Sequence, residues 1–385
     1  MRSKWMWIGC LASLATVVQG QQSILPTERQ STLWTHGCFQ MWRVQYAHYA
    51  ISQVSFPLAL YIPLHDQINL NVSTIPAISA WGSAYKLNGL SDTWVQGTYM
   101  GRNEKWMANL GMGIPTGKTR LTNDEMTFTT EILSQNMFNF RVPIYGGGFC
   151  VKAGGGLAYP IMEKLVLGVG GQYVVHTPYH PVRYSYTYRS QYGIAERTAD
   201  LKYKPGNEIA LQLGFDWKAG ETTKTMFDVQ YSVYGKDRLE GESIYGSGPK
   251  VAVNAGFFHQ YDEQFVWVHL TYRVKGKHEL LNGLEFVAAE KNLNGDQIEL
   301  GVVWKALPFR NGEFFVFGDG RFYARNQYQK AGASIYGGGF GLNFILSPTV
   351  TLNANVRYFG GTLKDADLKR NTEGMEILCG FKTVL

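Results

Sequence analysis

Residues Val350 to Tyr358 read VTLNANVRY, and this stretch decides the fold. Successive side chains of an extended strand point to opposite faces, so the alternating residue types separate in space. One face is apolar and the other polar: Val350, Leu352, Ala354, Val356 and Tyr358 lie on the first, Thr351, Asn353, Asn355 and Arg357 on the second. The pattern predicts a strand between an apolar and an aqueous environment.

The segment before this strand has the same alternation. Its apolar positions are Phe340, Leu342, Phe344 and Leu346, and only residues 347–349 separate it from Val350. Two alternating segments with so short a connection predict an antiparallel hairpin. The hairpin alone leaves open whether its apolar face contacts a second sheet or lipid.

The same period recurs along the chain in sixteen segments. They cover residues 42–46, 54–62, 68–74, 93–99, 106–114, 149–159, 165–175, 209–217, 227–233, 251–257, 266–274, 298–304, 314–322, 340–346, 350–358 and 375–385. The fourth segment is weak, and the first two could form one bent strand. The sequence therefore predicts fourteen or sixteen strands, since bacterial outer-membrane barrels have even numbers.

The connections alternate between short and long. Short ones fall at 63–67, 102–105, 161–164, 218–223, 259–264, 307–312 and 346–349, and long ones at 79–91, 117–146, 177–206, 235–249, 275–295 and 362–372. Outer-membrane barrels have this asymmetry, with short periplasmic turns and long extracellular loops. We predict an all-β fold, a transmembrane up-and-down antiparallel β-barrel of about 14–16 strands. A soluble β-sandwich is the alternative.

Aromatic residues near the short turns support the membrane interpretation. Trp106, Tyr159, Trp217, Phe309 and Phe314 are placed to form a girdle at the headgroups. The lipid bilayer of the outer membrane is then the barrel's partner. A nucleic-acid partner is not expected, because the 36 Lys and Arg residues form no basic stripe.

The N-terminus has the features of a secretory signal. Residues 1–20 read MRSKWMWIGCLASLATVVQG, with basic residues, an apolar region and a small-residue cleavage site. We predict a cleaved signal peptide (1–20), a short periplasmic or lumenal arm (21–38) and a barrel (39–385), located in the cell outer membrane. A lipoprotein with Cys10 as acceptor is the alternative.

Two short motifs flank a strand, a turn and a second strand. Gly89-Leu90-Ser91-Asp92 comes first, and the second strand closes on Ile114-Pro115-Thr116-Gly117. This order resembles outer-membrane proteins of aromatic-degradation (meta-pathway) operons, relatives of the FadL-type channels, in which a GLGD-like entry precedes LPTG. The resemblance covers about residues 52 to 120 and implies passive passage of small, including apolar, molecules. The asparagine-proline-alanine signature of FadL-type channels is absent.

Charged residues on the polar faces of the strands are candidates to line the pore. They are Arg43, Lys152, Glu208, Asp216, Lys224, Asp228, Arg273, Glu299, Lys305, Asp319, Arg321, Arg325 and Arg357. Their mixed signs predict no strong preference for cations or anions, which would need rings of one sign. The alternative is that they only solvate the lumen.

The connection from Lys118 to Asn139 contains a possible helix. Thr122 or Asn123 could cap it, and Met126, Ile132 and Leu133 would share one side. One hypothesis is that this segment folds over or into the pore as a constriction. The other is a mobile external loop, as long barrel loops commonly are.

Motifs for catalysis or cofactor binding do not match this sequence. In GMGIPTGKT (111–119), Met112 stands where a phosphate-binding loop needs glycine. Cys38, Cys150 and Cys379 lack metal-site spacing, and no ordered nucleophile-base signature is present. We therefore predict a porin-like channel or passive transporter for small-molecule solutes, without catalytic residue, metal or cofactor. A structural, secretion or adhesion barrel that acts through its loops is the alternative, an enzyme is third, and the oligomeric state stays open.

Overall fold

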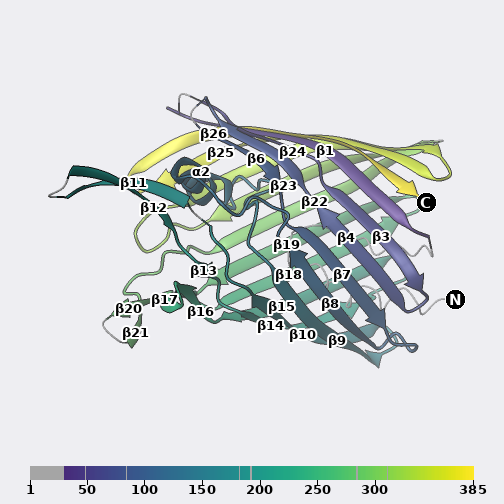
Figure 1. Ribbon diagram of the computed structural model, residues 1–385. Coiled ribbons are helices and arrows are strands. Elements are labelled where there is room, and N and C mark those ends of the chain that lie inside the picture. The colour runs from purple at the N-terminus through teal and green to yellow at the C-terminus, as the bar shows by residue number, and fades with distance from the viewer. Residues whose placement is uncertain are drawn as a thin grey trace.

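The computed structural model describes residues 30–47, 49–83, 85–181, 183–190, 193–282, 285–309 and 311–385. The predicted signal peptide (1–20) and residues 21–29 of the predicted arm lie outside these residues. Figure 1 shows a barrel seen from the side, with almost all of the chain in strands. No helix in the described part of the chain is long and apolar enough to cross a membrane.

Sixteen strands form the closed wall within the described residues, and three of them are interrupted once. The wall consists of β1 (Thr32–Val44), β2 (Ile51–Ser55) with β3 (Leu58–His65), β4 (Ile68–Thr74) with β5 (Pro76–Trp81), β6 (Tyr85–Leu90) with β7 (Thr93–Met100), β8 (Trp106–Ile114), β9 (Cys150–Met162), β10 (Leu165–His176), β14 (Glu208–Trp217), β15 (Thr223–Tyr234), β18 (Lys250–Tyr261), β19 (Gln264–Lys275), β22 (Gln297–Phe309), β23 (Gly312–Tyr323), β24 (Gly332–Ser347), β25 (Val350–Asp365) and β26 (Leu368–Val384).

Each wall strand pairs antiparallel with its neighbours in the chain, and the first and last strands close the ring. Thr32 of β1 is in register with Val384 of β26 on one side and with Tyr61 of β3 on the other. Closure satisfies the backbone amides of every strand, which a lipid environment requires. Each of the sixteen predicted segments overlaps one of these wall strands. The count is sixteen rather than fourteen, because β1 and β2 are separate strands paired antiparallel.

The outer face is apolar, as β14 illustrates. Its alternate residues Ile209, Leu211, Leu213, Phe215 and Trp217 are 38–56% exposed, although each is large and apolar. The residues between them face the lumen, where Ala210, Gln212 and Asp216 are buried. Each such side chain gains about 1.5–3 kcal/mol when it leaves water. The outer face therefore suits a lipid bilayer, and the transmembrane barrel is confirmed.

The two rims differ as predicted. Tight turns such as Asp66-Gln67 and Pro348-Thr349 lie at one end, which we call the short-turn rim, together with Ser31 and Leu385. Of the predicted girdle, Trp106, Tyr159, Trp217 and Phe309 are exposed on the outer face near this rim, and Phe314 is half-buried against Phe340. The long connections gather at the opposite end, the long-connection rim (Figure 1).

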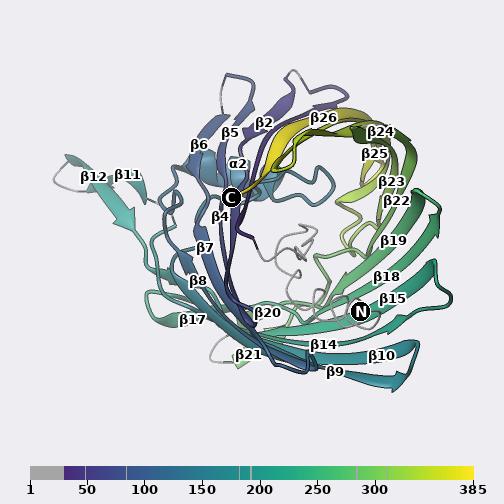
Figure 2. The ribbon, with the colours of Figure 1, turned by 90° about the vertical axis from the view of Figure 1, so that its right-hand side faces the viewer.

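Several long connections contain strands of their own. Residues 79–91, predicted as a loop, instead extend the wall as β5 and β6. The hairpin of β11 (Arg183–Ser190) and β12 (Gly193–Asp200) projects away from the barrel in Figures 1 and 2. A five-stranded sheet at the long-connection rim comprises β13 (Tyr203–Lys204), β16 (Lys236–Leu239), β17 (Glu242–Gly246), β20 (Glu279–Asn282) and β21 (Glu285–Ala288).

Two predictions about the first strand are wrong. The strand starts at Thr32, so the part of the predicted arm up to Cys38 belongs to the wall. The alternation that assigns Arg43 of segment 42–46 to the polar face places Trp42 on the lipid face, yet Trp42 is 1% exposed and points inward with Cys38 and Gln40. The reason is that the lumen here contains an apolar core, which an alternating pattern cannot distinguish from lipid.

Candidate functional site

The connection between β8 and β9 folds back into the barrel, and we call residues 117–147 the lumenal loop. It begins with the helix α2 (Asn123–Phe128), which Thr122 caps by accepting a hydrogen bond from the Glu125 amide. The Glu125 side chain accepts in return from the Thr122 amide, completing a capping box. A π-helical turn, η1 (Thr129–Leu133), follows directly. The predicted helix and its cap at Thr122 are confirmed.

Both ends of the lumenal loop are held by one carboxylate. Asp92, between β6 and β7, accepts hydrogen bonds from the amides of Gly117 (3.0 Å) and Gly147 (2.7 Å). The Asp92 amide donates to the carbonyl of Tyr145 at 3.0 Å. The last residues of the two motifs singled out in the sequence thus contact each other. A Cβ on Gly117 would lie 2.1 Å from the Tyr145 carbonyl oxygen, so this close contact needs glycine.

The lumenal loop forms an apolar core with the inner wall. Its buried residues are Phe128, Leu133, Met137, Phe138, Phe140, Val142 and Tyr145. They pack against inward-facing residues of β1, β2, β5, β6 and β23 to β25, including Trp42, Ile51, Leu87, Ile335 and Phe359. Trp42 stacks on Phe359 and touches Phe138, with ring centroids 5.3 Å and 5.4 Å apart. Figure 2, a view along the barrel, shows α2 inside the ring of strands.

Two glutamines of the wall bind the backbone of the lumenal loop. The Gln40 side chain donates to the carbonyl of Asn139 (2.9 Å) and accepts from the amide of Arg141 (3.0 Å). Gln53 binds Val142 in the same way, accepting from its amide at 2.9 Å and donating to its carbonyl at 3.0 Å. Each glutamine side-chain amide therefore makes the hydrogen bonds to the loop backbone that a neighbouring strand would otherwise make.

A tyrosine of the loop closes this network. The Tyr145 hydroxyl lies 2.9 Å from Ser79 Oγ and donates to the carbonyl of Leu87 at 3.2 Å. Gln53 also donates to Ser79 Oγ, at 2.8 Å. Burial raises the pKa of Tyr145 to about 12, so its hydroxyl stays protonated and able to donate at neutral pH.

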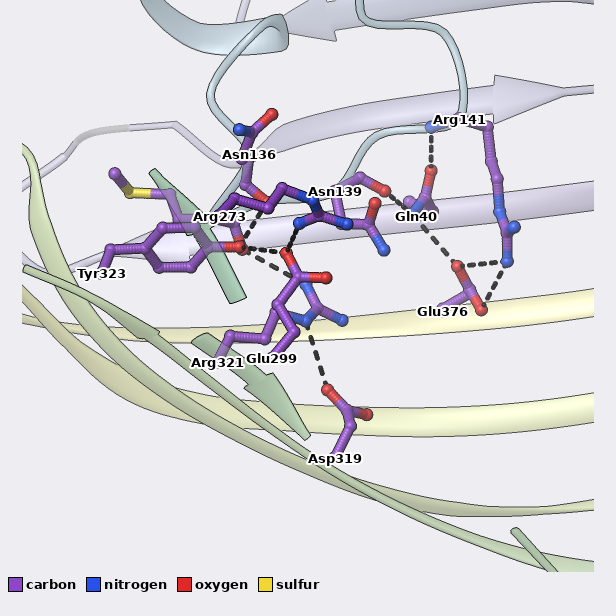
Figure 3. A network of polar contacts seen from close by, with 11 residues as sticks. Gln40, Asn136, Asn139, Arg141, Arg273, Glu299, Asp319, Arg321, Tyr323 and Glu376 are labelled. Carbon is purple, nitrogen blue, oxygen red and sulfur yellow. Dashed lines mark hydrogen bonds and ion pairs between the residues drawn. The ribbon is translucent and has the colours of Figure 1, made fainter. Parts of the chain in front are cut away.

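An ion pair joins the loop to the last strand. Arg141 Nη2 lies 3.1 Å from both carboxylate oxygens of Glu376 on β26, and Gln40 donates to the same carboxylate at 3.1 Å (Figure 3). The Glu376 side chain is 5% exposed and that of Arg141 is 33% exposed. Burial alone would lower the pKa of Arg141, but Glu376 raises it and the net change is upward. Arg141 therefore keeps its charge.

A second group of polar contacts holds the loop from β23, three strands away from β26 in the ring. Arg321 Nη1 donates to the Met137 carbonyl at 3.2 Å, and the Tyr323 hydroxyl donates to the Asn136 carbonyl at 3.1 Å. Arg321 also pairs with Asp319 (3.2 Å), and Arg273 pairs with Glu299 (2.7 Å), as Figure 3 shows. The loop is thus fixed to the inner wall at β1 and β26 and again at β23. The hypothesis of a segment folded into the pore is confirmed, and the external-loop alternative is wrong.

Most of the candidate pore-lining charges face the lumen, and most are partnered there. Lys152 lies over the ring of Trp94 at 4.8 Å, Asp216 pairs with Lys224 at 3.1 Å, and Lys305 pairs with Glu313 at 2.6 Å. Asp228 accepts from Gln212 (3.2 Å) and Asn254 (2.9 Å). Glu208 is on the inward face of β14, in line with Ala210 and Gln212.

Two candidates do not line the pore. Arg43 lies at the long-connection rim on the outer face of β1, with its side chain 65% exposed and Glu373 at 3.9 Å. Arg325 follows the end of β23, in the connection to β24, and its side chain lies beside Gly332. For Arg43, the alternation assigned the wrong face of β1 to the lumen. For Arg325, the predicted strand extended beyond the end of β23 at Tyr323. These two predictions are corrected.

Several residues that hold the loop were not found from the sequence. Gln40 and Gln53 are uncharged and fall on no motif, and Arg141 lies in a connection. Glu376 had a visible signal, because it is an acidic residue between the apolar Met375 and Ile377 in an alternating segment. Its partner, however, is 235 residues away along the chain.

Comparisons with known proteins give a likeness of fold. No family model matches the chain, and no curated protein matches it. Solved structures that align include the CymD monoaromatic hydrocarbon channel, 12% identical with a TM-score of 0.44, covering 93% of this chain and 89% of that one. A TodX monoaromatic hydrocarbon channel mutant is 9% identical with a TM-score of 0.45, covering 98% and 94%. A bacterial polysaccharide outer membrane secretin is 8% identical with a TM-score of 0.45, covering 93% and 99%. Similarity this low assigns no substrate to this chain.

Proposed function

We propose that this protein is a passive channel of the outer membrane for small molecules, including apolar and aromatic ones. The observation that carries the proposal is the lumenal loop, which narrows a closed, lipid-facing barrel from within. A barrel that served only as a membrane anchor would have no need for a loop fixed to its inner wall by hydrogen bonds and an ion pair. The short-turn rim faces the periplasm in this proposal, as in outer-membrane barrels generally.

The lining supports passage of uncharged solutes and of solutes of either charge, rather than selection of cations or of anions. Ion pairs such as Arg273 with Glu299 and Lys224 with Asp216 place both signs on the inner wall. Rings of a single sign, which give strong ion selectivity, are not formed by these pairs. The predicted signal peptide at residues 1–20 agrees with export to the outer membrane.

The test compares two shortened variants in proteoliposomes. Replacing residues 120–144 by a short Gly-Ser linker removes the lumenal loop, whereas replacing 183–200 removes the projecting hairpin and serves as the matched control. We expect the wild-type protein to admit small sugars and aromatic acids in a swelling assay. The loop variant should admit larger solutes faster, and the hairpin variant should behave like the wild type. A wild-type protein impermeable to all of these solutes would exclude the channel.

A second candidate function rests on the long-connection rim. The five-stranded sheet and the projecting β11–β12 hairpin give this rim an ordered surface outside the barrel (Figure 1). Such a surface is favoured in a barrel that adheres to or assembles with another molecule. The same two variants separate the functions, because loss of a cell-surface phenotype on removal of the hairpin, with permeability unchanged, would favour this second candidate.

A further inference from the structure

Below the lumenal loop, toward the short-turn rim, the inner face of β24 has no side chains at three successive inward positions. Gly337, Gly339 and Gly341 occupy these positions, and side chains from both flanking strands lie across them. A Cβ at Gly339 would lie 3.0 Å from Arg357 Cγ, and one at Gly341 would lie 2.9 Å from Phe317 Cε2. The glycines therefore let Arg357 and Phe317 lie flat against the wall.

Arg357 and Phe317 contact each other over this glycine stripe. The guanidinium carbon of Arg357 lies 4.4 Å from the ring centroid of Phe317, within the range of a cation-π interaction. This contact holds the planar guanidinium in a defined orientation at the lumen wall. Both side chains are half-buried, so part of each faces the lumen.

A row of aromatic rings continues from Phe317 along the inner wall. Phe315 stacks on Phe317 (6.4 Å between centroids, 11° between planes), Phe265 follows at 6.2 Å and Phe258 at 5.4 Å. These residues come from β23, β19 and β18 and all are half-buried. We call this row the aromatic patch. These large, half-exposed rings face the lumen, so contact with lipid does not account for them.

Two positive charges lie beside the aromatic patch, Lys305 over Phe265 (5.9 Å) and Arg357 over Phe317. Lys305 is already paired with Glu313, whereas Arg357 has no such partner in the described part of the chain. Each of the other arginines in this region is paired: Arg141 with Glu376, Arg321 with Asp319 and Arg273 with Glu299. Among the described residues, Arg357 has no carboxylate within 4.0 Å, and its buried Nε has no hydrogen-bond partner. A buried donor without a partner costs free energy until a ligand or water supplies the acceptor.

We propose that Arg357 and the aromatic patch form a binding subsite for aromatic carboxylates of the size of benzoate. This inference rests on the proposed channel function and names its solute class. The carboxylate accepts hydrogen bonds from the Arg357 guanidinium, whose planar fork matches carboxylate geometry. The ring of the solute lies on the phenylalanine rings, which favour offset-stacked or edge-to-face contact.

Other solute classes fit this site less well. A neutral arene would contact the aromatic patch but leave the charge of Arg357 without a counterion. A phosphate or sulfate would find one available arginine, because the neighbouring arginines are already paired, and would gain nothing from the rings. An aliphatic carboxylate would satisfy Arg357 and lose the stacking contact.

The test measures benzoate binding to the full-length, detergent-solubilised protein by titration calorimetry. Arg357→Gln should weaken benzoate binding about tenfold or more, because a charge-assisted hydrogen bond is removed. Arg357→Lys keeps the charge without the planar fork and should fall between the wild type and Arg357→Gln. Phe317→Leu should weaken the binding of benzoate more than the binding of cyclohexanecarboxylate. Arg43→Gln, the same change on the outer face, should leave binding unchanged.

Several outcomes would overturn the inference. They are no benzoate binding to the wild type, equal binding to Arg357→Gln and Arg43→Gln, or equal affinity of the wild type for benzoate and cyclohexanecarboxylate. A difference in gel mobility between unheated and heated samples identifies variants that have folded. Sugar permeation into proteoliposomes is measured in parallel. Permeation without benzoate binding would reject the subsite and keep the channel, whereas benzoate binding without any permeation would reject the channel.

Discussion

Single side chains fix the lumenal loop to the wall, and Arg141 makes the contact whose loss is simplest to interpret. It contributes the charge that neutralises the nearly inaccessible Glu376 carboxylate. Without Arg141, that carboxylate would keep only the hydrogen bond from Gln40. Leaving one member of a buried pair alone is strongly destabilising, whereas exposed pairs contribute little.

We therefore expect Arg141→Ala to release the lumenal loop from β26. The cost should be about 3 kcal/mol, at the lower end for a broken buried pair, because Arg141 is one-third exposed. Limited trypsin digestion of the solubilised protein, with identification of the fragments, should show faster cleavage at Lys118 and Arg120. The control is Arg43→Ala, which removes an exposed arginine from the rim. Equal cleavage rates in the two variants would contradict the assigned role of Arg141.

Among the elements, the lumenal loop combines local and distant contacts. Its helix α2 is specified locally, by a capping box that joins residues three apart. Its position is specified at its base, where Asp92 accepts from the amides of Gly117 and Gly147. Loss of the cap should loosen the helix alone, while loss of the Asp92 contacts should loosen the whole loop.

Hydrogen exchange measured by mass spectrometry distinguishes these two effects. Asp92→Ala removes two charge-assisted hydrogen bonds, each contributing about 1.5–3 kcal/mol, and exchange should rise throughout residues 115–149. Thr122→Ala should cost about 1 kcal/mol and raise exchange only within 123–133. In both variants, β8 and β9 should stay protected by their wall partners. A rise confined to α2 in Asp92→Ala would show that the base contacts do not position the loop.

For the molecule as a whole, the alternation of apolar outer and polar inner residues along strands such as β14 and β15 makes the barrel a membrane protein. On β14 and β15 the outer positions are apolar and the inner ones include Gln212, Asp228 and Gln230. A charge therefore has opposite consequences at adjacent positions, since the bilayer excludes it and the lumen hydrates it.

Leu213→Arg and Gln230→Arg test this difference directly. Leu213 is 54% exposed on the outer face, and we expect its replacement by arginine to destabilise the barrel by about 2–4 kcal/mol if it lies near the bilayer midplane. Gln230→Arg places the same charge in the lumen and should cost much less. Equilibrium unfolding in lipid vesicles measures both variants. Similar destabilisation by the two substitutions would contradict the assignment of faces.

Much of the barrel could be predicted from sequence because alternation is a relation between consecutive residues. The strand segments, a count of fourteen or sixteen, the lipid face of strands such as β14 and the contrast between the rims all follow from it. The same rule placed eleven charged residues in the lumen but misplaced Arg43 and Trp42 on β1. There the interior is apolar, and polarity alone cannot tell such an interior from lipid.

What the sequence by itself determined, then, is the wall: its strands, its closure and the side that lipid covers. Only the tertiary structure decided which connection enters the barrel and what it contacts. Gln40 meets Asn139 across 99 residues and Glu376 across 336. Arg357 contacts the Phe317 ring, and lacks a carboxylate partner among the described residues, because of the side chains that neighbouring strands place around it. Such pairings depend on strand register and on the inward fold of the loop, and neither leaves a periodic trace in the sequence.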